Sequence, residues 1–408
     1  MNLSIVNKEL KEPDCEFVER KGKGHPDTLS DALSEKLSVV YSNYTLKHFG
    51  AVLHHNFDKV GMLGGASFVR FGEGYLTKPI RILLNGRASL KFGDESIPVE
   101  QMLISTTKEF MKQRFPMIDV EKDLEFHYNL STQSSPGKTA ENGAEKGTRQ
   151  RWFEPRTLND LQEIREGLFS NDTSLGVGYA PYSCLESLVL EIEETLNSDQ
   201  FRCGHPWIGS DIKIMGFRNR NEFDITLCIP QISTYVQNEQ EYRNNLDFCK
   251  KIIRNLVETK GIQKFDLHVN TRDNYEKSEL YLTATGSSIE SGDEGLVGRG
   301  NRINGVISPM RLMSMEGACG KNPVYHIGKL YYVAAMNLSN LIYDKFNIRN
   351  EVSLVSQSGR DLLDPWIVQV NVPEKFKDKV ELSKFVREEL KKIPDLTSLL
   401  LNEKIRLY

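Results

Sequence analysis

The order of hydrophobic patterns along the chain is the feature that most constrains the fold. Segments with apolar residues at helical spacing are interleaved with segments in which apolar and polar residues alternate, without a strict strand–helix–strand rhythm. This irregular order favours an α+β fold. The clearest helix is predicted to begin at about Thr28, with Thr28 and Asp31 as a capping box and Gly50 as its stop.

The rest of the chain adds elements of both kinds. A polar stretch, 131–147, is predicted to be a long exposed loop and is a candidate seam between domains. Further helices are predicted at 101–114, 158–168, 185–196, 241–258, 328–344 and 374–392. Strands are predicted at 51–63, 79–84, 124–130, 211–217, 223–229, 265–269, 279–285 and 366–372.

Size and charge exclude several classes of protein. The 408 residues suffice for two to three domains of roughly 150 residues each. With 52 Lys and Arg against 56 Asp and Glu, the net charge of −4 predicts no global attraction to nucleic acid or to an anionic membrane. No stretch resembles a signal peptide or approaches the roughly 18 apolar residues of a spanning helix. Because the six cysteines form no C-x-x-C pair, a reducing cytoplasm is the expected location.

The first chemically informative segment is residues 21–27, Lys-Gly-Lys-Gly-His-Pro-Asp. Its glycines let the backbone approach a ligand, its cations attract anions, and the following helix offers N-terminal amides. Asp27 could ligate a metal ion, whereas the alternative is a simple turn and helix cap. A second Gly-His-Pro, at 204–206, precedes Trp207 instead of a carboxylate and is interpreted as structural.

Three more segments place charged residues beside glycines. They are 171–179, which resembles a polar turn around a flexible glycine pair, 292–302 and 320–329. None is a Walker A or G-x-G-x-x-G motif, so a P-loop ATPase and a Rossmann dehydrogenase are not supported. The mixture of cations and carboxylates suits a polyphosphate with Mg²⁺, most simply ATP. The cations are His25, Arg299, Lys321 and Lys329, and the carboxylates are Asp27, Asp172 and Asp293.

Several of these motifs occur in the order found in one family. They lie at 18–27, 54–56, 171–174, 298–302 and 320–323. The chain resembles S-adenosylmethionine synthetase of the archaeal type, from about Glu16 to about Lys329 and more weakly beyond. The resemblance implies that methionine sulfur attacks the 5′ carbon of ATP, and that the released tripolyphosphate is cleaved to phosphate and pyrophosphate. It also implies Mg²⁺ as a cofactor and leaves K⁺ open as a second ion.

The resemblance assigns roles residue by residue. His25 would support departure of the oxygen that bridges ribose and triphosphate, with Arg299 and Lys321 gripping the phosphates. Asp27 would hold Mg²⁺, and Asp31 would either join the metal shell or remain a capping-box acid. Asp293 would contact methionine, with Asp58 as a second-rank candidate for the same role. Asp172 would contact the nucleoside. Arg302 and Lys329 are second-rank candidates for binding phosphate.

The resemblance also implies an architecture. It consists of three similar α+β domains related by pseudo-threefold symmetry, in a homodimer whose active sites lie between subunits. The expected limits are about 1–125, 126–270 and 271–408, with segments free to exchange between domains.

The chain departs from the archaeal pattern at three single positions and in one segment, an expected Gly-x-Gly-Ser that is represented at best by residues 131–135. Gly61 stands where an acid is expected, Lys59 where an amide is expected, and Tyr325 where an asparagine is expected. Two alternatives to a methionine adenosyltransferase therefore stay open: a non-catalytic nucleotide-binding paralogue, and an adenosyltransferase for another thioether. His54 and His55 match the pattern, but adjacent strand residues face opposite sides and should not ligate one ion together.

Overall fold

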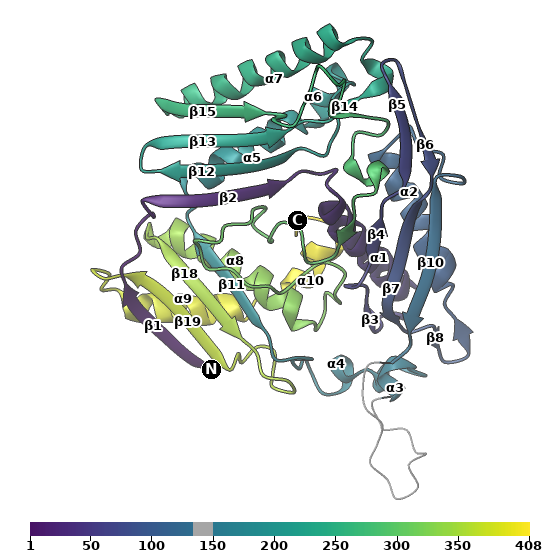
Figure 1. Ribbon diagram of the computed structural model, residues 1–408. Coiled ribbons are helices and arrows are strands. Elements are labelled where there is room, and N and C mark those ends of the chain that lie inside the picture. The colour runs from purple at the N-terminus through teal and green to yellow at the C-terminus, as the bar shows by residue number, and fades with distance from the viewer. Residues whose placement is uncertain (134–149) are drawn as a thin grey trace, which may run out of the picture.

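Three β-sheets of four or five strands, each with its own helices and hydrophobic core, form most of the described structure. The computed structural model describes residues 1–133 and 150–408. Figure 1 shows the sheets arranged around the middle of the molecule, each with helices against one face. The predicted α+β class is confirmed, because helices and sheets are both abundant and the sheets mix parallel and antiparallel pairs.

The first sheet combines the two ends of the chain with its middle, so it carries both purple and yellow-green strands in Figure 1. The long helix α8 (Ile327–Phe346) packs on it, and α9 (Lys379–Leu390) lies beside α8. Its strands, in spatial order, are β1 (Asn2–Lys8), β19 (Ile367–Pro373), β18 (Asn350–Val355) and β11 (Leu175–Ala180).

The second sheet packs against α1 (Pro26–Phe49) and α2 (Val99–Arg114). Its strands, in spatial order, are β10 (Leu124–Ser131), β7 (Ile80–Ala88), β4 (Gly61–Leu63) and β17 (Gly295–Leu296), and β3 (His55–Asn56) also pairs with β7.

The third sheet packs against α5 (Cys184–Leu196) and α7 (Glu239–Thr259). Its strands, in spatial order, are β15 (Lys264–Val269), β13 (Glu222–Cys228), β12 (Lys213–Asn219) and β2 (Cys15–Lys21).

Smaller elements complete the fold. The short helices are α3 (Gln150–Phe153), α4 (Gln162–Arg165), α6 (Asp199–Gly204) and α10 (Asp395–Leu401), with 3₁₀ turns at Leu158–Asp160, Ser233–Tyr235 and Ser288–Ser291. Two-stranded pairs are β5 (Ala66–Arg70) with β6 (Glu73–Lys78), β8 (Lys91–Phe92) with β9 (Glu95–Ser96), and β14 (Gln231–Ile232) with β16 (Leu282–Thr283).

The N-terminus of α1 differs from the prediction. The predicted capping box of Thr28 and Asp31 is wrong, because the N-cap is His25 and Pro26 is the first helical residue. The Thr28 hydroxyl instead donates to the backbone oxygen of Lys21. The predicted stop is confirmed, since Gly50 adopts φ +81° and its N–H donates to Leu46 O.

Most long helices are confirmed, but several other predictions are wrong. The helix predicted at 158–168 is two short turns, because Leu161 between them has an extended backbone. The strand predicted at 51–63 is only β3 and β4, and that predicted at 279–285 is only β16. The loop predicted at 131–147 lies, after residue 133, outside the described residues.

The glycine pair at 176 and 178 is not a flexible turn but part of β11. A Cβ on Gly176 would lie 2.3 Å from the backbone C and O of Tyr331, which belongs to α8. The two glycines therefore allow a helix backbone to pack directly on a strand. In the described part of the chain, no helix has the length and apolar character needed to cross a membrane.

Candidate active site

A buried polar stripe on α1 brings the predicted segments together. Asp27, Asp31, Glu35 and Ser38 are spaced by four, four and three residues, so they share one face of the helix. Each binds the backbone of a distant loop. The contacts are Leu296 N–H to Asp27 Oδ1 at 3.0 Å, Gly298 N–H to Asp31 Oδ1 at 2.8 Å, Gly320 N–H to Glu35 Oε2 at 2.9 Å, and Ser38 Oγ to Lys321 O at 3.2 Å.

The N-terminal end of the stripe carries charged groups from two of the predicted segments. Lys21 Nζ lies 2.8 Å from Asp27 Oδ2 and donates to the backbone oxygen of Arg299 at 2.7 Å. The guanidinium of Arg299 is exposed and has no hydrogen bond or ion pair to residues 1–133 or 150–408. It is therefore available to an anion beside Asp27.

His25 is held as a neutral ring at this end. Its Nδ1 accepts the backbone N–H of Asp27 at 3.2 Å, which leaves the proton on Nε2. Burial lowers the pKa of His25, and the nearby charge of Asp211 only partly opposes that shift. The ring can thus donate a hydrogen bond from Nε2 without carrying charge.

Asp211 is a residue of this region that sequence reasoning missed. It is 2% exposed, and its Oδ2 accepts Ser288 N–H at 2.9 Å and Ser288 Oγ at 2.6 Å. The same hydroxyl lies 3.0 Å from Oδ2 of the exposed Asp293, so the predicted methionine contact is linked to a buried carboxylate near His25. In the sequence, Asp211 stood out only as the first residue of the strand predicted at 211–217.

Asp31 and Arg302 hold the glycine-rich loop at 298–300. Asp31 is buried, and burial raises its pKa to about 7 despite the Gly298 N–H that favours the charged form. Arg302 donates to the backbone oxygens of Gly298 and Gly300 at 2.6 and 2.8 Å. The Arg302 guanidinium is therefore occupied by backbone.

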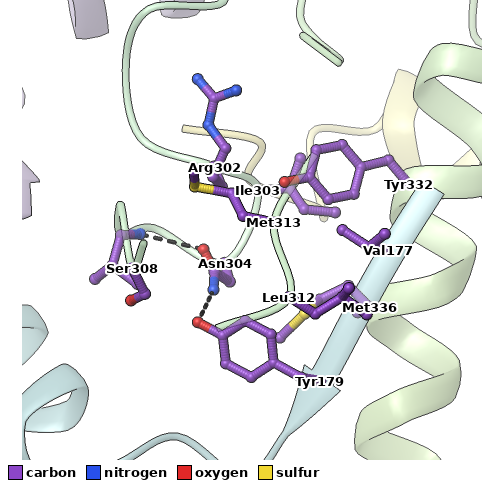
Figure 2. A pocket seen from close by; sticks show the side chains of 12 residues that line it. Val177, Tyr179, Arg302, Ile303, Asn304, Ser308, Leu312, Met313, Tyr332 and Met336 are labelled. Carbon is purple, nitrogen blue, oxygen red and sulfur yellow. Dashed lines mark hydrogen bonds between the residues drawn. The ribbon is translucent and has the colours of Figure 1, made fainter. Parts of the chain in front are cut away.

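A small cavity beside Arg302 offers little room for a ligand. Figure 2 shows Arg302, Ile303 and Met313 in the upper part of the view with Tyr332 beside them, and Tyr179 at the bottom. Its volume of about 10 Å³ is no more than the space of one water molecule.

A much larger cavity, of about 750 Å³, lies beyond the other end of the α1 stripe. It is lined by Asp58, Asp172 and Lys321, which were predicted as site residues, and by Glu316, which was not. Lys59 and Arg87 also line it, and Lys59 forms an ion pair with Asp58 at 2.6 Å. This volume and this mixture of charges suit a polar ligand of substrate size.

Lys321 is fixed in the cavity wall by its backbone. Residue 321 forms a β-bridge with Asn56, and Phe57 N–H donates to Gly320 O at 2.8 Å. Gly320 has φ +78°, and a Cβ there would lie 1.9 Å from Ser34 Oγ, so only glycine fits. The Gly-Lys pair therefore presents the lysine beside Asp58.

Opposing effects act on the pKa of the Lys321 ammonium. Burial lowers its pKa to about 8, whereas the charges of Asp58 and Asp172 oppose that shift. The Glu316 carboxylate touches the ammonium directly and also favours its charged form. We therefore treat Lys321 as a cation at neutral pH.

The expected asparagine position, Tyr325, belongs to an aromatic wall of this cavity. The Tyr325 hydroxyl lies 2.6 Å from His54 Nδ1, and the ring centroids of Tyr325 and Trp152 are 4.8 Å apart. His55 instead contacts Ser38 Oγ through Nε2 at 2.7 Å. The two histidines thus have separate partners, and only His55 belongs to a strand.

Lys329 does not reach the cavity. It is fully buried, and its Nζ forms an ion pair with Glu35 at 2.7 Å between α1 and α8. At Gly61, a Cβ would meet Leu296 Cδ2 at 2.8 Å, so the pairing of β4 with β17 occupies the place of the expected acid.

No group of three or more His, Cys, Asp or Glu side chains suitable for a metal ion occurs among the described residues. Asp27 is the better candidate ligand, because among residues 1–133 and 150–408 its Oδ2 is bound only by the Lys21 side chain. Asp31 fits poorly, since it is buried against the loop at 298–300. Any ion here would take most of its ligands from substrate, water or another subunit.

The chain is similar to known proteins over nearly its whole length. The sequence profile of the S-adenosylmethionine synthetase family matches residues 3–141 and 155–404. The S-adenosylmethionine synthase of Hyperthermus butylicus is 37% identical over 99% of this chain and 98% of its own. That of a Saccharolobus islandicus strain is 40% identical over 98% and 97%.

Two further similarities extend beyond the archaea. A probable S-adenosylmethionine synthase of Aquifex aeolicus is 38% identical over 96% of this chain and 95% of its own. The structure of an unusual S-adenosylmethionine synthetase from Campylobacter jejuni covers 96% of this chain and 94% of its own, with a TM-score of 0.57 at 14% identity, and supports the fold alone. The chain belongs to the S-adenosylmethionine synthetase family.

Proposed function

We propose that this protein is an ATP:methionine S-adenosyltransferase. It joins L-methionine to the adenosyl group of ATP and cleaves the tripolyphosphate, with water, to phosphate and pyrophosphate. The observation that carries the proposal is the family match over nearly the whole chain. It is supported by the convergence of the predicted glycine-rich segments on α1.

The rate of this reaction depends mainly on how well the leaving group is stabilised. A thioether sulfur is nucleophilic without a general base, so the difficult step is the build-up of negative charge on the departing triphosphate. The neutral His25 ring donates from Nε2 to the oxygen that leaves the 5′ carbon. Arg299 and Lys321 bind the phosphate chain.

Asp27 is the residue that would hold Mg²⁺, with Lys21 withdrawing from its Oδ2. When bound, Mg²⁺ would neutralise charge on the phosphate oxygens. K⁺ remains a candidate second ion. Asp31 and Arg302 act by holding the loop that carries Arg299, and Lys329 acts by joining α8 to α1.

The remaining assignments concern methionine and the nucleoside. Asp293, exposed and linked through Ser288 to Asp211, would attract the methionine ammonium or the new sulfonium. Asp58 is the second methionine candidate, and Asp172 contacts the nucleoside.

We further propose a homodimer whose sites are shared between subunits. The 750 Å³ cavity contains Lys321 but neither Asp27 nor Arg299, and Asp27 and Ser38 lie about 16 Å apart along α1. A partner subunit would supply the missing group to each site. The cytoplasmic location and the absence of nucleic-acid and membrane partners belong to the same proposal. So do three related domains near 1–125, 126–270 and 271–408. Three separate cores support the number of domains, although β1 pairs with β19 and β2 with β12 across these limits.

Product analysis tests the activity. Incubation with ATP, L-methionine and Mg²⁺ should yield a sulfonium product with equal amounts of phosphate and pyrophosphate, and omission of methionine should abolish the sulfonium. ATP binding without these products would favour a nucleotide-binding paralogue. A faster reaction with another thioether would point to the second alternative, which Gly61 and Tyr325 keep open.

Subunit mixing tests the shared site. Asp27→Asn and Lys321→Ala should each inactivate the homodimer. Mixed dimers should recover part of the activity, because one of their two sites combines the native Asp27 of one subunit with the native Lys321 of the other. No recovery in mixed dimers of verified composition would place both residues in a site within one chain.

A further inference from the structure

The Lys321 ammonium already has an internal anion as its partner. Oε1 of Glu316 contacts Lys321 Nζ, and Oε2 of the same carboxylate accepts Ser174 Oγ at 2.5 Å. Both Glu316 and Lys321 line the large cavity. The lysine assigned to phosphate is therefore occupied by a carboxylate.

The two partners differ in how firmly the fold holds them. Lys321 is bridged to Asn56, its backbone oxygen accepts Ser38 Oγ, and its side chain is only 6% exposed. The Glu316 side chain is 26% exposed, and its neighbour Met315 is 84% exposed.

The segment that carries Glu316 is anchored by side chains and not by backbone pairing. Ser314 Oγ donates to Leu175 O and accepts Glu316 N–H, and Ala318 and Cys319 are buried. From residue 312 to 319, no backbone N–H donates to a backbone oxygen anywhere in the described chain. Because its side chain is partly exposed and no backbone pairing surrounds it, the Glu316 carboxylate can swing away from the ammonium while Lys321 stays in place.

The first turn of α8 closes one side of the pair. A Cβ on Gly328 would lie 2.4 Å from Glu316 Oε1 and 2.6 Å from Lys321 Nζ. A ligand cannot approach the ammonium through this turn, so the approach is from the cavity. A phosphate oxygen needs the same donor that the carboxylate now uses.

We propose that Glu316 is an internal competitor for Lys321, which it occupies until a polyphosphate displaces it and to which it returns as products leave. This inference rests on the proposed function of the cavity as a polyphosphate site. Its consequence is weaker binding of tripolyphosphate than Lys321 alone would give, in exchange for faster release. Glu316 is thus a positioning residue that acts through Lys321.

Binding of inorganic tripolyphosphate, at a fixed excess of Mg²⁺, tests the competition. Calorimetric titration of Glu316→Gln should give a Kd about tenfold lower than that of the native protein. The matched control is Glu166→Gln, which removes a charge from the same cavity wall but only from an exposed pair with Arg165. Its Kd should stay within about twofold of the native value. An unchanged or higher Kd for Glu316→Gln, or a native protein that does not bind tripolyphosphate, would overturn the proposal.

A double substitution separates competition from a general charge effect. In a Lys321→Met background, Glu316→Gln should no longer tighten tripolyphosphate binding, because the ammonium for which Glu316 and phosphate compete has been removed. An equal tightening in both backgrounds would contradict the proposal. Thermal unfolding of each variant checks that it is folded.

The adenosyltransferase assay is read separately. If the native protein makes no sulfonium product but its tripolyphosphate affinity responds to Glu316→Gln as stated, the proposed function fails and the competition stands. If the sulfonium forms and the tripolyphosphate affinity does not respond to Glu316→Gln, the proposed function stands and the competition fails.

Discussion

His25 caps a helix with one ring nitrogen and leaves the other for the chemical role proposed above. Its Nδ1 caps α1 by accepting the Asp27 N–H, and this fixes the proton on Nε2. A side chain that caps a helix is held in place by backbone geometry, so the remaining N–H is already oriented when a ligand arrives. The sequence alternatives of helix cap and functional residue are therefore compatible here.

Replacement of this donor should slow the adenosyl transfer. We expect His25→Gln to lower kcat by at least on the order of 100-fold, because the leaving oxygen loses a preorganised donor. The measurement is the initial rate of sulfonium formation at saturating ATP and methionine.

The second Gly-His-Pro provides the matched control. The His205 ring Nδ1 contacts Phe201 O, and the ring packs among Phe201, Trp207 and Phe248, none of which is assigned to the site. His205→Gln should leave kcat within about twofold. A similar loss in both variants would show that His25 acts through general stability.

At the level of elements, α8 connects the first sheet to α1. It packs directly on β11 through two glycines, and its Lys329 forms the buried ion pair with Glu35. The positions of the 320–329 loop and of the glycine-rich loop at 298–300 thus depend on how two helices and one strand pack.

The β11–α8 contact should not tolerate a methyl group. Gly176→Ala should lower the free energy of unfolding by about 1–3 kcal/mol, since the new Cβ would overlap the backbone of Tyr331. Urea denaturation measures the change. Gly204→Ala is the control, because a Cβ there meets nothing within 4 Å, and it should be neutral or slightly stabilising. Equal stability of both variants would mean that α8 shifts without cost.

The buried ion pair should be costly to break from one side only. Lys329→Met leaves the Glu35 carboxylate buried without its cation and should cost about 3–5 kcal/mol. The double variant Lys329→Met with Glu35→Leu should recover part of that loss in the same unfolding measurement. A double variant that is less stable than the single one would show that the Gly320 N–H contact of Glu35 matters more than its charge.

Periodicity predicted the long elements, and spacing alone could have revealed one more feature. The amphipathic helices α2, α5 and α7 follow their predicted ranges closely, because one face of each is buried. The polar stripe on α1 has helical spacing and was visible in the sequence, but buried carboxylates contradict the usual pattern and were not expected.

Long-range packing explains what the sequence could not predict. β11 was missed because its glycines are explained only by α8 on its face. Glu316 was missed because nothing local distinguishes it from an exposed acid, and its contact with Lys321 depends on where two loops meet. The expected sharing of segments, by contrast, came with the family resemblance and not from any pattern in the residues.

For the molecule as a whole, buried neutral histidines link stability to pH. Burial lowers the pKa of His55 to about 3 from an ordinary 6.5. Between these values the unfolded chain takes up a proton that the folded chain does not. The free energy of unfolding therefore falls as the pH drops through this window. Burial likewise lowers the pKa of His54 and of His326.

The contribution of one ring can be isolated. We expect His55→Asn to reduce the dependence of unfolding free energy on pH, between about pH 4 and 6, by about 1.4 kcal/mol per pH unit. Urea titrations at several pH values give both slopes. Identical slopes for the native protein and the variant would mean that His55 takes up a proton in the folded state as well.

The placement of β1 beside β19 has a consequence for synthesis. Asn2 lies opposite Ile367, so β1 leaves the ribosome long before the strand with which it pairs. At roughly 5–20 residues per second, β1 waits for roughly 20–70 s before its partner has been translated. Its neighbour β2 can find β12 much earlier, once residue 219 has emerged. The nascent chain must therefore carry an unpaired amino-terminal edge through most of its translation, and this strand is where we expect molecular chaperones to engage it.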